Sequence, residues 1–257
     1  MGAGLNFIGL DLAWSVRNPS GGAVVALEGG GGRLSEAALL GDDAEVLAFL
    51  DRHAGPGCIV AIDAPLRVPN ETGRRPAEAD LGAVFGRFQA GAHPTNRRRV
   101  GDASGSVRGE RLVAALEERG FVHDPRLVAG EQARRVVEVY PHPAMVSLFG
   151  LARTLKYKNK GQDKVILHGA WAELHAHLKA LETAEPPLHG LDTLLGTDIT
   201  PLRGRSLKNH EDRIDAVFCA YIALYAWHWG PARTEIFGTL EGGYILSPTL
   251  PERWAGA

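Results

Sequence analysis

CIVAID, at residues 58–63, is an uninterrupted apolar run that ends in a carboxylate. Its β-branched residues favour a strand that is covered on both faces of a sheet, and the proline shortly after Asp63 ends such a strand. LNFIGLDL (5–12) and GAVVALE (22–28) are further strand candidates, separated by a turn rich in Gly, Asn, Pro and Ser. Asp11 lies at the end of the first of them. Two predicted strands therefore end in an aspartate.

Turn and capping residues separate the other predicted elements. The run GGGG (29–32) predicts a hairpin connection into RLSEAALL, a third strand candidate. Asp42 is the predicted N-cap of a helix through AEVLAFLDRHA, because its side chain can accept hydrogen bonds from the free amides of a first turn. RRVVEVYPHP (134–143) is a strand candidate closed by its prolines, HEDRIDAVFCAYIALYAWHWG (210–230) is the clearest helix, and EIFGTLEGGYILSP (235–248) has the pattern of a small hairpin.

The two long connections differ in composition. Residues 66–133 are rich in Arg, Gly and Pro and contain two predicted helices, at about 76–90 and 109–119, so we interpret them as an insertion. Residues 144–208 are predicted to be mostly helical. Strands separated by helices that must cross over a sheet are typical of an α/β fold with a mixed sheet. We expect a single domain over residues 1–257, with helices flanking the sheet and a hairpin at the C-terminal end.

Composition limits the function classes. The 257 residues are 45% hydrophobic and 23% charged with a formal net charge of -2, so no global field draws the protein to nucleic acid or to an anionic membrane. Cys58 and Cys219 lie in apolar runs, which favours two buried thiols over a disulfide. The N-terminus lacks a leader pattern, and no uncharged apolar stretch reaches the length of about 20 residues that spans a bilayer. We expect a cytoplasmic protein that does not enter membranes.

Acidic residues inside apolar strands need a physical reason, because burying an unpaired charge costs several kcal/mol. Asp11, Asp63 and Glu138 are three such residues. Taken singly, the aspartates can bond to turn amides and Glu138 can face solvent on an edge strand. Their joint occurrence in candidate central strands favours a shared site, since neighbouring strands bring the three acids to one place on the sheet.

Asp212 and Asp215 form a second acidic feature. Their i, i+3 spacing places both side chains on one helical face, and the helix carries no formal charge from Ala216 to Ala232. The alternative is that acids in a first helical turn only complement the helix dipole, most plausibly for Asp212. We expect all five acids to be catalytic, with Asp11, Asp63, Glu138 and Asp215 as metal ligands.

Clustered carboxylates suit Mg²⁺ or Mn²⁺, and two such ions can activate water and stabilise a leaving oxygen in phosphodiester hydrolysis. Phosphate binding is predicted for Arg97 and Arg98, and for Lys156 and Lys158, although solvated charged faces explain such runs as well. Arg99 extends the first cluster; the second also contains Arg153, Lys160 and Lys164. His142 and His210 can assist proton transfer or bind metal, or they can serve as surface or capping residues. Motifs of P-loop, α/β-hydrolase and zincin enzymes are absent from the sequence.

Five segments, in order, resemble the domain-of-unknown-function family 429, whose members are described as predicted ribonuclease H-like nucleases. They are FIGLDLAW, VAIDAPLRVP, EVYPHPA, KYKNKGQ and NHEDRIDAVFCAYIA, and together they span nearly the whole chain. The resemblance implies a ribonuclease H-like fold. It matches Asp11 to the first-strand aspartate, Asp63 to the fourth-strand acid and Asp215 to the final-helix aspartate.

The resemblance bears on further residues. Glu138 matches the family's strand-end glutamate, and Lys156 and Lys158 fall in its lysine-bearing segment. The pair Asp212 and Asp215 is similar to the i, i+3 acids of Holliday-junction resolvases on the same fold. Those enzymes act as dimers, so a homodimer is an open expectation, although the sequence shows no interface. Members often have an acid after the His-Pro, where this chain has Ala144, so a ligand at that position is not expected.

The sequence is consistent with three functions. The leading one is a Mg²⁺- or Mn²⁺-dependent nuclease or related phosphodiester hydrolase that acts on nucleic acid. The second is an actin-like phosphotransferase or ATPase, although the turn after Asp11, AWSVRNPSGG, poorly matches the glycine-rich turns that hold nucleotide phosphates. The third is a non-catalytic binding module on the same fold. DNA versus RNA and endo- versus exonuclease action stay open.

Overall fold

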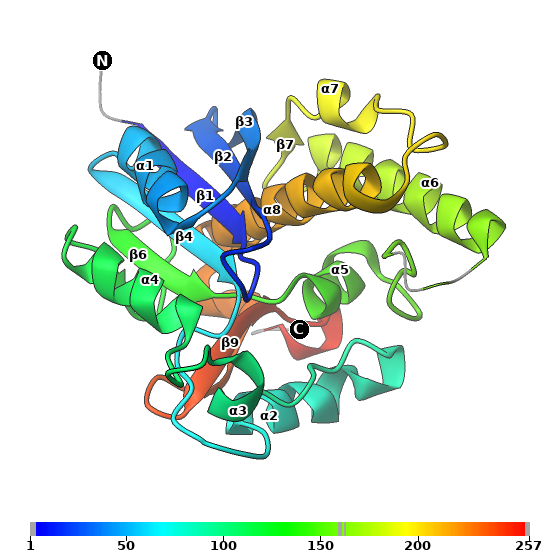
Figure 1. Cartoon of the computed structure of the whole chain (residues 1–257). Helices are drawn as coiled ribbons and strands as arrows, with labels where there is room; N and C mark the ends of the chain where they lie inside the picture. The colour runs from blue at the N-terminus through cyan, green and yellow to red at the C-terminus, as the bar shows by residue number, and fades with distance from the viewer. Residues whose placement is uncertain (1–3, 159–160, 162, 255–257) are drawn as a thin grey trace.

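A seven-stranded mixed sheet forms the centre of the computed structural model, which describes residues 4–158, 161 and 163–254 (Figure 1). The strand order is β5-β6-β4-β1-β2-β3-β7, and β8 and β9 form a separate hairpin. The strands are β1 (Leu5–Asp11), β2 (Ser20–Glu28), β3 (Gly31–Leu40), β4 (Gly57–Asp63), β5 (Val122–His123), β6 (Arg134–Glu138), β7 (Leu188–His189), β8 (Thr234–Thr239) and β9 (Gly243–Pro248). The predicted α/β class is confirmed, and the sheet is consistent with a ribonuclease H-like one.

Helices cover both faces of this sheet. They are α1 (Asp43–His53), α2 (Pro76–Phe85), α3 (Arg97–Val100), α4 (Arg108–Glu117), α5 (Pro141–Phe149), α6 (Lys164–Ala180), α7 (Asp192–Leu195) and α8 (Gly204–Trp229), with short 3₁₀ turns at Gly86–Phe88, Leu181–Thr183, Gly230–Ala232 and Pro251–Arg253. No helix in the described part of the chain is both long and apolar enough to cross a membrane.

Strand direction follows from the turns. β1, β2 and β3 are antiparallel neighbours, and Gly29 and Gly30 turn the β2–β3 hairpin with φ values of 57° and 85°, as a two-residue primed turn requires. β1, β4 and β6 run parallel, so their carboxyl ends meet at one edge of the sheet. The predicted hairpin connection and third strand are confirmed.

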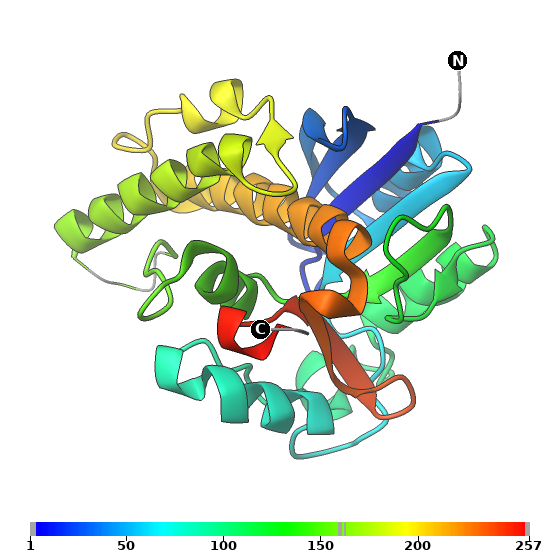
Figure 2. The ribbon, with the colours of Figure 1, turned by 180° about the vertical axis from the view of Figure 1, so that it is seen from behind.

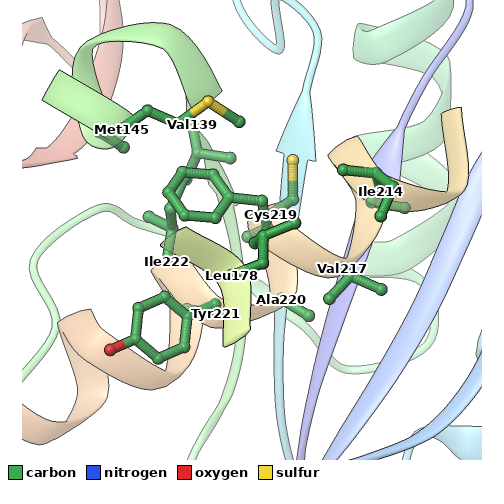
Figure 3. Close-up of a cluster of buried hydrophobic side chains, with 14 of the residues drawn as sticks. Val139, Met145, Leu178, Ile214, Val217, Cys219, Ala220, Tyr221 and Ile222 are labelled. Atoms are coloured by element: carbon green, nitrogen blue, oxygen red, sulfur yellow. The ribbon is translucent and has the colours of Figure 1, made fainter. Parts of the chain in front are cut away.

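The two faces of the sheet have separate apolar cores. Alternate residues of β1 and β4, such as Leu10 and Ile62, pack against α1 and α4 on one face. The other face, which includes Phe7 and Ala61, packs against α8, and Figure 2 shows α8 crossing that face with α6 beside it. Figure 3 shows side chains of α8 gathered with Met145 of α5 and with neighbouring apolar residues.

Several local predictions are confirmed. The Asp42 side chain accepts a hydrogen bond from the Glu45 amide at 2.9 Å and caps α1. Cys58 and Cys219 are buried free thiols. The predicted C-terminal hairpin is β8–β9.

Other boundaries differ from those predicted. The strand expected over 134–143 ends at Glu138, and Pro141 begins α5, because a first-turn residue of a helix needs no amide donor. The helix expected from 210 begins at Gly204. The segment 66–133 contains the expected helical stretches, but it also supplies the edge strand β5 and the sheet-covering helix α4.

Two glycines let α8 lie directly against the sheet. A Cβ at Gly9 of β1 would overlap the Ala216 carbonyl and the Ala220 amide of α8. A Cβ at Gly21 of β2 would overlap the Asp212 carbonyl. Backbone therefore contacts backbone where α8 crosses β1 and β2, and this contact sets the height of the α8 acids above the strand ends.

We expect Gly9→Ala to lower the free energy of unfolding by about 3 kcal/mol or more, because neither backbone can move away without separating α8 from the sheet. Urea denaturation followed by circular dichroism measures the change. Gly169→Ala is the matched control: it lies inside α6 with open space around its Cα, so the variant should be neutral or more stable by up to about 1 kcal/mol. Equal stability of the two variants contradicts the close-contact account.

Candidate active site

Asp11 and Asp63 end two adjacent parallel strands in register. They are direct partners in the β1–β4 pair, and the preceding partners, Leu10 and Ile62, point into the α1–α4 core. Because side chains alternate along a strand, both aspartates face the opposite side, toward α8. Both retain partial exposure, as expected at the end of a sheet.

Asp215 approaches the same place from α8. Its side chain is fully buried, with 0% exposure. The Tyr157 hydroxyl donates a hydrogen bond to Oδ1 at 2.6 Å, and the ammonium of Lys158 lies 2.8 Å from Oδ2. Both oxygens of Asp215 are therefore held by the loop that precedes α6.

Electrostatic interactions link the three aspartates. Burial raises the pKa of Asp11 well above its usual value, and Asp215 and Asp63 raise it further. Burial likewise raises the pKa of Asp63 to about 7; Asp215 adds to this rise and Lys158 opposes it. Burial also acts to raise the pKa of Asp215, but Lys158 and the Tyr157 hydroxyl outweigh it and the pKa falls below its usual value. The predicted convergence of these three acids is therefore present in the fold.

Lys158 is the cation of this cluster. It was predicted to bind substrate, and it forms an ion pair with Asp215. Burial lowers its pKa, but the attraction of Asp215 is stronger, with smaller contributions from Asp11 and Asp63, so the pKa lies well above its usual value. A charged ammonium thus balances part of the negative charge of the three carboxylates.

Asp212 has a different partner. The Lys208 ammonium lies 2.6 Å from Asp212 Oδ1 and 2.6 Å from Glu211 Oε1. Because α8 begins at Gly204, Asp212 lies beyond the first turn, so the alternative of a helix-start charge is wrong. Asp212 and Asp11 line the same cleft, of about 570 Å³, together with Lys208, Arg205, Asn18 and Trp14.

Glu138 is bound by an arginine that the sequence analysis missed. Arg75 donates to Glu138 Oε1 at 2.6 Å and to Oε2 at 3.0 Å, and the Leu66 amide donates to Oε2 at 2.8 Å. Arg75 also pairs with Glu78 at 2.6 Å, and all three side chains are buried. Burial raises the pKa of Glu138, and Arg75 partly offsets this rise. Both oxygens of this predicted ligand thus already have donors.

Glu138 nevertheless lies near the aspartates. Its negative charge contributes to the raised pKa of Asp63, and both residues line one depression of about 100 Å³. By strand alternation, however, Glu138 shares the face of its partner Ile62, opposite to that of Asp63.

Arg97, one of the two predicted phosphate-binding arginines, lies in a loop-stabilising network. Arg97 forms a two-pronged ion pair with Glu110, at 2.8 and 3.1 Å, and donates to the Gly105 carbonyl at 3.0 Å. Arg98 and Arg99 are exposed. The guanidinium of Arg97 therefore stabilises the loop.

The other predicted basic residues are spread out. Lys156 is exposed and lines a separate surface depression with Arg153. Lys164 begins α6, and Lys160 lies outside the described residues. Of the second predicted cluster, Lys158 is the residue that the structure places against an acid of the site.

The two predicted histidines have different environments. His142 Nδ1 lies 3.1 Å from Thr154 Oγ1, and its ring lies beside that of Tyr157, with centroids 6.0 Å apart. Its charge helps to lower the pKa of Asp215, so it belongs to the surroundings of the site. His210 packs against Trp171 and His175, and burial followed by His175 lowers its pKa to about 4.

The oxygen donors of the site are of the kind that a divalent metal ion needs. Asp11, Asp63 and Asp215 supply oxygen donors of the kind that Mg²⁺ and Mn²⁺ prefer. Within residues 4–158, 161 and 163–254, however, no three His, Cys, Asp or Glu side chains are already arranged around a common metal position. Since Lys158 holds Asp215, the donor types fit a divalent cation once the ammonium moves away.

Arg75, Tyr157 and Lys208 are site residues that the sequence analysis missed. Lys208 precedes Asp212 by one helical turn, an i, i+4 spacing that indicates an ion pair on a helix. Tyr157 lies between two lysines that were singled out, but nothing local shows that it points inward. Arg75 gave no signal, because its partner Glu138 is 63 positions away.

We expect the free energy of unfolding, measured with a chelator that removes metal ions, to depend on pH because of Asp63. The pKa of Asp63 is raised to about 7 in the folded state, whereas it lies near 4 in the unfolded state, so the unfolded state loses this proton first as the pH rises. The contribution of Asp63 to stability is therefore complete below about pH 4 and is lost as the pH rises through 7. Relative to Asp63→Asn, the wild type should therefore lose on the order of 2–4 kcal/mol between pH 4 and pH 8. Urea denaturation of both proteins across this range measures the difference. Parallel curves contradict the raised pKa.

Arg75→Met should lower the free energy of unfolding by about 3–5 kcal/mol, because it leaves Glu78 and Glu138 buried without their cation. Arg119→Met is the control, since Arg119 pairs with Asp51 at the surface and its loss should cost about 1 kcal/mol or less. Chemical denaturation of the two variants compares the costs. Similar small losses in both variants would show that the Arg75 network contributes little to stability.

Comparison with known proteins places the chain in a family. Residues 9–235 match the model of the family described as "Protein of unknown function (DUF429)", and this range contains every acid of the site. Neither the curated proteins nor the solved structures give a match to this chain. Because the match covers most of the sequence, the chain belongs to the DUF429 family.

Proposed function

We propose that this protein is a Mg²⁺- or Mn²⁺-dependent nuclease or related phosphodiester hydrolase. The observation that carries the proposal is the meeting of Asp11, Asp63 and Asp215 at one sheet edge, where Asp215 raises the pKa of both other aspartates and Asp63 raises that of Asp11. Such a concentration of buried carboxylates is costly unless a cation balances it. An open cleft leads to Asp11, so a substrate can reach the cluster.

The residues present suggest a division of roles. A bound divalent cation supplies Lewis acidity and an activated water. Asp11 and Asp63, on the rigid ends of β1 and β4, would hold the cation, and Asp215 would join them from α8. Tyr157 keeps one oxygen of Asp215 oriented. Lys158 would then pair with a phosphate oxygen near the acids in place of Asp215.

Nucleic acid is the proposed substrate class because a phosphodiester is an anion that needs both cation binding and positive side chains. Lys208 and Arg205 line the cleft beside Asp11. Two buried free thiols fit a reducing compartment, so we propose a cytoplasmic location. A homodimer stays a prediction.

A non-catalytic binding module is the second candidate, and one observation favours it. Lys158 and Lys208 already compensate several of the acids without a metal ion. In that function the two lysines would stay paired with the acids, and no metal ion would bind there. Metal uptake separates the two candidates.

Purified protein should cleave a panel of single-stranded, duplex and four-way-junction oligonucleotides in Mn²⁺, and chelation should abolish cleavage. Asp11→Asn and Asp63→Asn should each lower the rate by about 10²-fold or more, because each removes a charged donor from the cation site. Asp80→Asn, at an exposed carboxylate on α2, is the control and should retain wild-type activity.

Calorimetric titration with Mn²⁺ provides a readout that does not depend on the choice of oligonucleotide. Uptake by the wild type and its loss in Asp63→Asn support the metal site. Cleavage that survives both Asn substitutions excludes the proposed mechanism. A wild-type protein that takes up no Mn²⁺ favours the binding module.

A further inference from the structure

Trp14 is an exposed aromatic residue beside the acids. Its side chain is 50% exposed, whereas Trp171 is fully buried and Trp227 is partly buried against the core. It follows Asp11 by three positions, in the loop that leaves the end of β1. An exposed indole offers a large aromatic face for contact with a ligand.

The surroundings of Trp14 place it between the two sides of the acidic cluster. It lines the large cleft together with Asp11 and Asp212. It also lines the smaller depression that contains Asp63 and Glu138. The indole therefore borders both openings, next to the point where Asp11 and Asp63 meet.

The large cleft has the size and polarity to hold a nucleotide. Its volume of about 570 Å³ lies within the range of small-molecule sites. Arg205 and Lys208 provide positive charge on one wall, and Asn18 and Asn209 provide amide groups. Among the residues that the structure describes, Arg205 makes no ion pair, so its guanidinium is available to a phosphate.

We propose that Trp14 is a stacking platform for an unpaired base, so that the protein acts on single-stranded nucleic acid or on single-stranded parts of a larger substrate. This inference rests on the proposed nuclease function. A base stacked on the indole would place the neighbouring phosphate beside Asp11 and Asp63, with Arg205 and Lys208 along the backbone. A paired base cannot serve, because its faces are covered by its neighbours in the duplex.

Binding to fluorescein-labelled oligonucleotides of about 12 nucleotides, oligo-dT and oligo-U, measured by anisotropy in Ca²⁺, tests the platform without measuring cleavage. Trp14→Ala should raise the Kd for these single strands by at least about fivefold, the low end of the range for losing one base–aromatic stack. Trp14→Phe should stay within about threefold of the wild type. Trp14→Leu, which keeps apolar bulk without an aromatic face, should bind as weakly as Trp14→Ala.

Val16→Ala is the matched control, because Val16 is exposed in the same loop and does not line the cleft. It should bind single strands as the wild type does. A duplex of the same length should bind more weakly than the single strand, with a Kd that Trp14→Ala leaves unchanged. If Trp14→Ala fails to fold, the comparison of the Phe and Leu variants still decides the role of the ring.

Unchanged single-strand affinity in Trp14→Leu, or a wild-type preference for duplex, overturns the platform. If Mn²⁺-dependent cleavage persists in that case, the proposed nuclease function stands and only this inference fails. If the wild type neither binds these oligonucleotides nor cleaves any of the panel, both proposals are overturned together.

Discussion

The contact between the backbone of α8 and the backbones of β1 and β2 is the constraint on which the site depends. Gly9 and Gly21 leave no room for a Cβ beneath α8, so the helix lies closer to the sheet than side-chain packing permits elsewhere. This short separation brings Asp215, fully buried, over the strand ends that carry Asp11 and Asp63. At a larger spacing, water would enter between the carboxylates and their mutual influence would weaken.

The charge balance of the cluster explains its unusual electrostatics. Three acids share one region at the sheet edge, and Lys158 forms a direct ion pair with Asp215. The consequence is uneven: the pKa of Asp215 falls, whereas the pKa values of Asp11 and Asp63 rise. Lys208 also acts to lower the pKa values of Asp11 and Asp63, but burial outweighs it, and the remaining imbalance is the physical reason for proposing a divalent cation there.

Sequence patterns predicted the parts of this site that depend on local order. Asp11 and Asp63 were identified because each ends an apolar strand, and parallel neighbours place such ends together. The start of α8 was missed because its first residues, from Gly204 onward, are polar apart from Leu207 and show no apolar periodicity. The two-residue strands β5 and β7 are too short to give any period. Tyr157 and Arg75 reach their partners through tertiary packing, which no local spacing encodes.

The two acidic groups of the protein differ in how fully they are compensated. Glu138 and Glu78 share Arg75, whose guanidinium fits both carboxylates, and the Leu66 amide completes the set of donors. Such a network is closed, and its role is to hold the loop after β4 against α2. The aspartates are balanced by the lysines Lys158 and Lys208, Asp11 and Asp63 are partly exposed, and a cleft opens at Asp11. An incompletely compensated, accessible set of charges can exchange its cation more readily than a closed network can. We therefore propose the aspartates for the chemistry, while the predicted ligand role of Glu138 stays a prediction.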